Sequence, residues 1–527
     1  MQRGFVGALL LGLQLIPWLG LPVFGPGPAA LGSLLALGLV AVVVLCALVA
    51  YGREALTALE VPFAGALLMA AMLCTGMGLL QYFGLAGAWA PWISTGQPGE
   101  AYANLRQRNQ FATLTNLGLV ALLWWQASGP GGAQNAVRAR SRYLLCLLMA
   151  ACLAVGTAAS NSRTGLLQLL LVLVCSLVWQ RRALPWLRTP IGHTILVAVG
   201  AYAIAAWTLP LLLGTHPGQA GIVARLQDLS LDCQSRRVLW ANVWHLVLQR
   251  PWLGWGWGEL DYAHFITLYP GTRFCDILDN AHNLPLHLAV EVGLPMALSV
   301  CAALAWWVRR AAPWKERQPA RQLAWSVLGL VGVHSLLEYP LWYGPFQMVV
   351  VLALLLLWQT RRARAASTSD APVGTQSARL DVPKLVPHTP DALQVRNAVG
   401  LPVPWLWGGA SAFVLALCMF AAFDYWRMSQ LYLGAPQRAV AYRDSTLEKL
   451  QGIWLFADYV RFAELTTTPL QPTNAAHLNA LALQVLHFSP EPKVVRVLID
   501  SAAMLGQDAQ AAYYQARFDV AFGPANR

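Results

Sequence analysis

The residues best suited to chemistry gather in one long polar segment, Thr215 to Asn283, which separates two strongly apolar runs. Near its end stands His282, directly before the apolar run Leu284 to Trp307. An imidazole exchanges a proton near neutral pH, so His282 is a candidate for acid–base catalysis or phosphate contact. The alternatives are a cap for the following helix or a metal ligand, although His282 with His287 does not have the spacing of a zinc site.

Two arginines and a glutamate stand where apolar runs meet polar segments. Arg163 lies in a tight turn between two apolar runs, and Arg236 opens an aromatic-rich stretch of the polar segment. Because a guanidinium pairs bidentately with phosphate oxygens, both arginines suit a diphosphate; the alternative for Arg163 is a side chain that extends to lipid phosphate. Glu338 ends another apolar run, where it either orients a histidine or arginine or only terminates a helix.

The composition indicates an all-α polytopic membrane protein. Of the 527 residues, 57% are hydrophobic and only 11% are charged, which is far from the soluble average. The net charge of +12 does not indicate nucleic-acid binding, because lysine and arginine concentrate in short loops between apolar runs. We therefore expect membrane lipids and no nucleic acid among the partners.

Crossing a bilayer takes about 20 mainly apolar residues, which predicts about 11 transmembrane helices. The first is kept as a membrane helix because no convincing signal-peptide cleavage site follows it. The expected spans are 5–21, 29–50, 61–83, 110–126, 143–160, 164–179, 191–213, 284–307, 322–337, 344–358 and 404–423.

Alternate loops are rich in arginine and lysine, which predicts that they face the cytoplasm together with the N-terminus. The same alternation predicts that the four intervening regions and the C-terminal tail lie on the opposite face of the membrane. The four regions are Gly84 to Asn109, Ser160 to Arg163, the long polar segment, and Glu338 to Tyr343.

Domain boundaries follow from composition. We expect N-terminal transmembrane helices over 1–213, a large loop over 214–283, further transmembrane helices over 284–358, a flexible cytoplasmic linker over 359–403, a last span over 404–423, and a helical domain over 424–527. In that domain apolar residues recur at helical spacing. The predicted helices are Ala439–Phe462, Ala475–Leu486, Val494–Leu505 and Ala509–Phe522.

Two of the nine cysteines, Cys233 and Cys275, share the long loop. If this loop faces an oxidising compartment, they are candidates for a disulfide, but two unpaired thiols are equally compatible with the sequence. The other seven fall inside apolar runs, where thiols act as small hydrophobic groups.

Four stretches carry a resemblance to a known family: Asn104–Ala112, Ser160–Gly165, Ser235–Arg236 through Pro251–Gly258, and His282–Asn283 followed by Gly293. Together they resemble the PglL-type bacterial protein O-oligosaccharyltransferases of the O-antigen ligase/polymerase superfamily. The resemblance covers nearly the whole chain, and the Glu338–Tyr343 run and helical tail favour the protein-glycosylating branch. Two departures are Arg108, where a proline is expected, and Met296, where many relatives carry a second glycine.

The resemblance implies a C-type glycosyltransferase-like bundle in a bacterial inner membrane, with its active site facing the periplasm. It further implies transfer of a preassembled glycan from undecaprenyl diphosphate to a Ser or Thr hydroxyl of a periplasmic acceptor protein, pilin-like or other. His282 matches the family's essential histidine, Arg163 and Arg236 match its outer arginines, and Tyr339 or Tyr343 matches its functional tyrosine. Neither a cofactor nor a metal ion is expected.

Two alternatives remain at this stage. An O-antigen ligase would use lipid A-core as its acceptor. A transporter for a lipid-linked sugar would share the spans and arginines, but transporters place their coupling charges near the membrane midplane, whereas these charges gather at one face.

Overall fold

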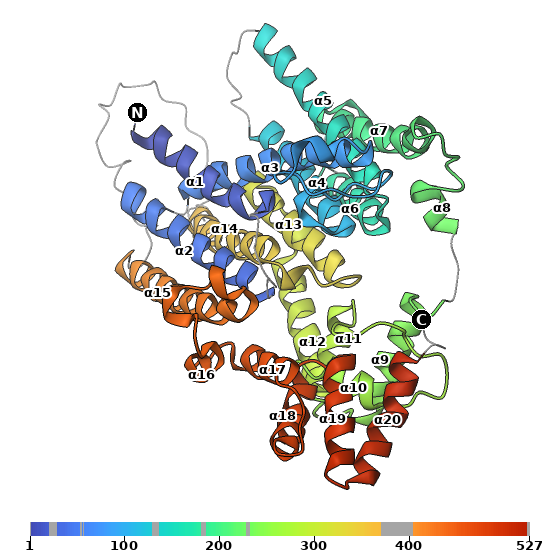
Figure 1. The fold of residues 1–527 in the computed structure, drawn as a ribbon. Helices are drawn as coiled ribbons and strands as arrows, with labels where there is room; N and C mark the ends of the chain where they lie inside the picture. Colours follow the sequence, from blue (N-terminus) through green and yellow to red (C-terminus); the bar gives the residue numbers. More distant parts are fainter. Residues whose placement is uncertain are drawn as a thin grey trace, which may run out of the picture.

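The computed structural model describes residues 2–20, 29–52, 55, 57–128, 136–180, 186–227, 232–369 and 404–523. In these residues every regular element is a helix, which confirms the all-helical class (Figure 1). The α-helices are α1 (Gln2–Leu19), α2 (Ala29–Tyr51), α3 (Glu60–Tyr82), α4 (Arg108–Ala127), α5 (Ala136–Ala159), α6 (Arg163–Trp179), α7 (Pro190–Leu212), α8 (Gly221–Gln227), α9 (Arg236–Gln249), α10 (Leu260–Ile266), α11 (Leu284–Val292), α12 (Leu294–Ala311), α13 (Pro319–Ser335), α14 (Gly344–Ser369), α15 (Pro404–Ser429), α16 (Thr446–Leu450), α17 (Ala457–Thr467), α18 (Ala475–Phe488), α19 (Pro492–Met504) and α20 (Asp508–Phe522).

Five helical stretches in the described part are long and apolar enough to cross a membrane. Three shorter apolar stretches, in α1, α6 and α14, accompany them, so the expected count of eleven spans stays a prediction. The five are Leu31–Tyr51, Glu60–Tyr82, Val137–Ala159, Pro190–Leu212 and Trp405–Tyr432.

Helix α4 lies at the centre of the main bundle. All its residues from Gln110 to Leu122 are buried, and Phe111 packs in one apolar core with side chains of α1, α3, α5, α6, α7, α13 and α14. Close approach to α3 requires Gly118, because a Cβ there would lie 2.3 Å from the Cβ of Ala71. The bundle therefore holds the N-terminal end of α4 in a fixed position.

The long loop folds into a small helical unit with its own core, formed by α9, α10 and α11. The prediction of one continuous helix from Leu284 to Trp307 is wrong, because α11 and α12 are separate helices that meet at Gly293. This glycine has a φ of 85°, and a Cβ on it would lie 2.2 Å from the Trp252 carbonyl oxygen. The backbone thus approaches too closely for any other residue, and the helix breaks there.

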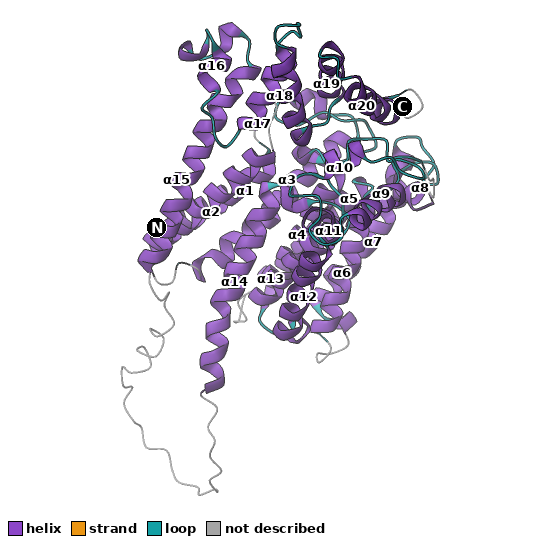
Figure 2. Cartoon of the chain, turned by 90° about the horizontal axis from the view of Figure 1, so that it is seen from below, coloured by secondary structure: helices purple, strands orange, loops and turns teal. Residues whose placement is uncertain are grey.

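The C-terminal helices α17 to α20 pack against the loop rather than standing apart from it. Phe265 of α10 lies in the core of the tail, and Arg517 donates a hydrogen bond to the Ile266 carbonyl at 2.9 Å. The predicted helix Ala439–Phe462 is wrong, since a 3₁₀ turn (Val440–Tyr442), α16 and α17 cover this stretch. Figure 2 shows α16 to α20 at one end of the molecule, with α14 running toward the other.

Two helices continue beyond their expected ends. Helix α14 reaches Ser369 and so includes the first part of the predicted linker, and α15 reaches Ser429. The rest of the predicted linker, 370–403, lies outside the described residues.

Candidate functional site

The imidazole of His282 faces a carboxylate. Its Nδ1 lies 2.6 Å from Oε2 of Glu338. Glu338 belongs to the connection between α13 and α14. The backbone of His282 has a φ of 51°, and its N–H donates to Oδ1 of Asn280 at 2.8 Å. A bulky residue in this left-handed conformation is strained, and such strain occurs most often at functional sites.

His282 does not cap the helix that follows it. Asn283 does so, because its Oδ1 accepts the N–H of Leu286 at 3.0 Å. The indole N–H of Trp240 in α9 also donates to the carbonyl of Ala281 at 3.0 Å and anchors the turn from behind. The imidazole is therefore left to interact with Glu338.

Glu338 is the centre of a network that joins three parts of the chain. Its Oε1 accepts hydrogen bonds from the Arg236 guanidinium and from Nδ2 of Asn109, the latter at 2.7 Å. Arg236 also donates to the carbonyl of Leu337. The side chain of Glu338 is only 7% exposed, so it depends on these partners for the hydrogen bonds that water would otherwise supply.

The charge of Glu338 follows from these contacts. Burial alone would raise the pKa of the carboxyl group, but the hydrogen bond with His282 and the charge of Arg236 outweigh burial. The pKa therefore lies below its ordinary value, and the carboxylate is ionised at neutral pH. An ionised partner at Nδ1 favours the tautomer that leaves Nε2 of His282 as a proton acceptor.

Asn109 ties the network to the turn that carries Arg163. Its Oδ1 accepts the hydroxyl of Ser162 at 2.5 Å, and the same hydroxyl accepts the N–H of Gly165 as the N-cap of α6. Arg163 is the next residue, is exposed, and has no hydrogen bond or ion pair within the described part of the chain. The N-terminal ends of α4, α6 and α9 thus meet around Glu338.

Further arginines approach this point. Arg225 in α8 donates to the carbonyl of Asn161 at 2.9 Å. Burial and the nearby charges of Arg108 and Arg163, with a smaller effect from Arg236, lower the pKa of Arg225 to about 10, against the opposing effect of Glu100. Arg163 and Arg236 therefore lie near Arg225 and Arg108. Arg108 pairs with Glu100 at 3.2 Å and Arg236 with Glu338, so the uncompensated positive charge lies on Arg163 and Arg225.

The two predicted tyrosines line the same site. The ring of Tyr339 meets the ring of His282 edge to face, with centroids 4.8 Å apart, and stacks on Tyr343 at 5.9 Å. Burial raises the pKa of both phenols, so they act as neutral hydrogen-bonding groups at physiological pH.

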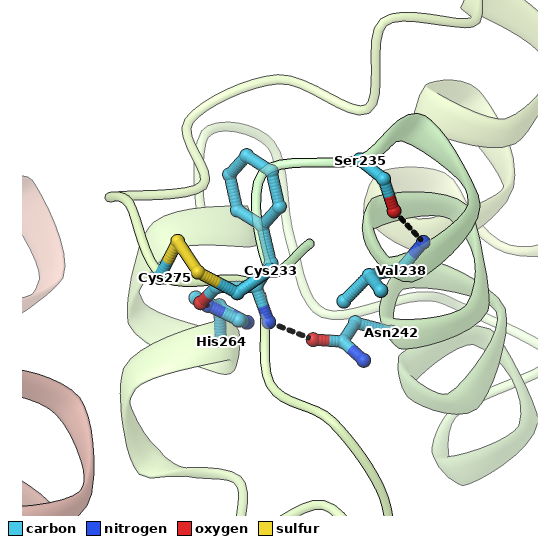
Figure 3. The surroundings of a disulfide bond; sticks show 7 residues. Cys233, Ser235, Val238, Asn242, His264 and Cys275 are labelled. Carbon is cyan, nitrogen blue, oxygen red and sulfur yellow. Dashed lines mark hydrogen bonds between the residues drawn. A yellow bond between two sulfur atoms is a disulfide. The ribbon is translucent and has the colours of Figure 1, made fainter. Parts of the chain in front are cut away.

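A disulfide joins Cys233 to Cys275, with their Cα atoms 5.4 Å apart (Figure 3). One cysteine precedes Arg236 and the other precedes His282, so the bond ties together the two segments that deliver these side chains. Two hydrogen bonds lie beside it. The Ser235 hydroxyl caps α9 by accepting the N–H of Val238 at 3.3 Å (Figure 3), and the N–H of Phe274, next to Cys275, donates to Oδ1 of Asn242 at 2.8 Å.

Three contributors were not singled out from the sequence as site residues: Asn109, Ser162 and Arg225. Asn109 and Ser162 lie within the stretches that carry the family resemblance, which was the available signal. Arg225 lies in no motif, and only its position in the polar segment hinted at a role. Among the described residues, no three His, Cys, Asp or Glu side chains form a group suited to a metal ion.

Three family models match the sequence, and each includes part of this network. The protein glycosylation ligase model covers residues 101–125, with Asn109. The O-antigen ligase model covers 148–301, with Arg163, Arg236 and His282. The C-terminal model of the virulence factor membrane-bound polymerases covers 322–380 and 389–527, with Glu338.

Two proteins of Acinetobacter baylyi are similar to the chain. A ComP-specific O-oligosaccharyltransferase is 23% identical over 49% of this chain and 44% of its own length. A general O-oligosaccharyltransferase is 25% identical over 55% of this chain and 48% of its own length. The chain therefore spans about half the length of these curated relatives.

The chain folds into a helical bundle with several helices apolar enough to cross a membrane, and His282 and Arg236 meet there at Glu338. The three matches and the two relatives support a PglL-type protein O-oligosaccharyltransferase of the O-antigen ligase/polymerase superfamily. The prediction made from the motifs is confirmed.

Proposed function

We propose that this protein transfers a preassembled oligosaccharide from undecaprenyl diphosphate to a Ser or Thr hydroxyl of an acceptor protein, at the periplasmic face of a bacterial inner membrane. The observation that carries the proposal is the pairing of His282 with Glu338 at 2.6 Å beside Arg236. A base and an anion-binding group are the two elements that glycosyl transfer from a lipid diphosphate needs.

In the proposed reaction Nε2 of His282 accepts the proton of the acceptor hydroxyl. The hydroxyl oxygen forms a bond to the anomeric carbon while the bond from this carbon to the diphosphate oxygen breaks. The leaving lipid diphosphate takes the bonding electrons, and Arg163, Arg225 and Arg236 stabilise its added negative charge. Glu338 keeps Nδ1 of His282 protonated, so that Nε2 accepts the proton.

The domain organisation belongs to the same proposal. The loop 214–283 and the helices after Asp424 lie at the periplasmic face, and they pack together through α10 and α18. The contact between α10 and α18 supports a role of the tail in receiving the acceptor protein near the segment that carries His282.

One observation favours the alternative function, an O-antigen ligase: the O-antigen ligase family model covers residues 148–301. Both readings use the same donor and the same proton acceptor. They differ only in the acceptor, which is a protein in one case and lipid A-core in the other.

The test is co-expression of the protein with a lipid-linked glycan pathway and a candidate periplasmic acceptor, followed by intact mass of the acceptor and of the lipopolysaccharide. We expect a glycan-sized mass gain on the acceptor that disappears with His282→Ala. The matched control is His477→Ala, because His477 contacts Glu464 at 2.9 Å in the exposed tail with no role at the site. Modified lipopolysaccharide with an unmodified protein would assign the ligase activity instead.

A further inference from the structure

A pocket lies in the segment between α3 and α4. This loop pocket has a volume of about 380 Å³ and is lined by Pro91, Ile93, Ser94, Thr95, Tyr102 and Arg106. Its volume falls in the range of small-molecule sites, which is about 300–1,000 Å³. Its wall combines two small hydroxyl residues, one aromatic ring and one guanidinium, a set that suits a polar and negatively charged ligand.

The wall of the loop pocket is held rigidly by a buried glutamine. Gln81 is fully buried at the end of α3, and its Nε2 donates to the carbonyls of Ser94 and Ala103 at 2.7 and 3.0 Å. Its Oε1 accepts the N–H groups of Tyr102 and Ala103 at 3.1 and 2.7 Å. One side chain therefore fixes both sides of the pocket.

Asn104 fixes the same wall from outside. Its Nδ2 donates to the carbonyls of Leu19 and Trp92 at 2.7 and 2.8 Å, and its Oδ1 accepts the N–H of Ser94 at 2.9 Å. The backbone is held in the left-handed region at two nearby positions, Ala103 with a φ of 51° and Arg106 with a φ of 57°. Such strain persists only where surrounding contacts impose it.

Arg106 is the charged group of this pocket and has no assigned partner. Its side chain is exposed, and no hydrogen bond or ion pair engages it within the part of the chain that the structure describes. The neighbouring carboxylate of Glu100 pairs with Arg108 at 3.2 Å instead. The guanidinium of Arg106 is thus available to a carboxylate or phosphate of a ligand.

The loop pocket is close to the site around Glu338. Arg106 comes three residues before Asn109, which donates to Glu338, so their Cα atoms are at most about 11 Å apart. An oligosaccharide on a diphosphate that is bound by Arg163 and Arg236 has to extend away from the anomeric carbon. The pocket lies within reach of its first sugar residues.

We propose that the loop pocket binds an acidic sugar residue of the donor oligosaccharide, with Arg106 pairing the sugar carboxylate. Thr95 offers a hydroxyl group to the sugar and the Tyr102 ring offers an apolar face, whereas the Ser94 hydroxyl is held by Ala103 and Gln81 and shapes the wall. This inference rests on the proposed function, because it takes the donor to be a lipid-linked oligosaccharide. The pocket would make the protein select acidic over neutral donor oligosaccharides.

The binding test uses the full chain with His282→Ala, so that no transfer takes place. The probes are a free oligosaccharide with one uronic acid and the same oligosaccharide after reduction of the carboxyl group. We expect the acidic probe to bind at least about ten-fold more tightly than the neutral one, and Arg106→Gln to remove this difference. Arg106→Lys keeps the positive charge and should restore part of the affinity difference between the two probes. Thermal unfolding of each variant checks that it is folded.

The matched control is Arg461→Gln, because Arg461 is an exposed arginine of the tail that contacts Asp458 at 2.6 Å. It should leave both affinities unchanged. Equal binding of the two probes, or unchanged binding by a folded Arg106→Gln protein, would overturn the proposal. Arg106-dependent binding of vesicles rich in phosphatidylglycerol, without binding of the acidic sugar, would also overturn it in favour of a lipid headgroup.

A second measurement separates this inference from the proposed function. With transfer-competent protein, Arg106→Gln should raise KM for an acidic lipid-linked donor and leave kcat unchanged. Arg106-dependent binding of the acidic probe without any transfer by the wild type would support the pocket and contradict the proposed function. Transfer whose KM changes neither with Arg106→Gln nor with loss of the sugar carboxylate would support the proposed function and contradict the role of the pocket.

Discussion

Two histidines of the long loop have opposite surroundings. His264 is 2% exposed, with Nδ1 2.8 Å from the Tyr269 hydroxyl and Nε2 3.2 Å from the Phe274 carbonyl. Burial, with a smaller effect from Arg273, lowers its pKa to about 3. The side chain of His282 is 24% exposed, and its Nδ1 faces the carboxylate of Glu338.

The comparison shows that the partner and the exposure, rather than the residue type, decide what a histidine does. Both nitrogens of His264 are engaged by neutral groups inside an apolar core, so this ring is uncharged and contributes to packing. His282 has an anion at Nδ1, and its Nε2 makes no hydrogen bond among the described residues. One loop therefore holds a buried packing histidine and a partly exposed candidate for proton transfer.

The largest expected effect is a loss of transfer activity, and it should distinguish His282 from His264. His282→Ala should lower transfer by about 10² to 10⁴-fold with little change in thermal stability, because it removes the proton acceptor from a partly exposed position. His264→Ala should instead lower the unfolding temperature, because it leaves a cavity and unpaired polar groups. Transfer rates and unfolding curves of the purified variants measure both, and equal loss of activity in equally stable proteins would refute the distinction.

Removing the disulfide should destabilise both of the loop segments that it joins. Cys233 and Cys275 are 42 residues apart, and closing a loop of this length stabilises the folded state by about 4 kcal/mol in the chain-entropy account. Cys233→Ser with Cys275→Ser should therefore increase protease cleavage within the loop and lower transfer. Treatment of the wild type with a reductant provides the control and should have the same effect. No change in either readout would mean that packing alone holds the loop.

Glu338→Gln tests whether the carboxylate matters through its charge. The amide keeps the size of the side chain but cannot stabilise a charged imidazole, so transfer should fall by about 10²-fold. Glu464→Gln is the matched control, since Glu464 faces His477 in the tail. If Glu338→Gln retained the full rate, the contact with His282 would serve only to hold the turn.

The smallest expected effect is the pH dependence of loop stability. The pKa of His264 is about 3 in the folded protein and about 6.5 in the unfolded chain, so the unfolded chain binds more protons between these values. Stability from this group is complete above about pH 6.5 and declines on acidification, by about 2 kcal/mol at pH 5. Burial raises the pKa of Asp261 in the same helix to about 7, so this carboxyl group contributes a slope of the opposite sign. The test is therefore the difference between wild type and His264→Gln in limited proteolysis between pH 5 and 8, and the wild type should lose more stability on acidification. Parallel profiles of the two proteins would contradict the burial of a neutral ring.

Much of the architecture was predictable because apolar length and loop charge are local properties. The apolar runs became helices near their expected bounds, and the tail is helical as its spacing indicated. The failures came where the backbone leaves the helical conformation inside an apolar periodic pattern, at Gly293 and, within Ala439–Phe462, at Ser445, which has a φ of 49°. A periodic apolar pattern carries no information on how closely another backbone, here that of Trp252, approaches.

The site was predictable in its members more than in its connections. His282, Arg163 and Arg236 were chosen as candidates from residue type and motif, and Glu338 was expected either to orient a histidine or arginine or only to terminate a helix. The sequence left open whether Cys233 and Cys275 pair, and nothing in it indicated that Asn109 bridges Ser162 and Glu338. These contacts join residues that are distant along the chain, so spacing cannot reveal them.

The sequence by itself determined the helical class of the protein, the candidate side chains for charge and proton exchange, and the resemblance to a known family. Only the tertiary structure decided that Glu338 serves both His282 and Arg236, that Arg225 joins the arginines, and that His264 is a packing residue. Solvent exposure and the charge of a neighbour set the proton affinity of a side chain. Both arise when distant segments pack together, and no single segment contains them.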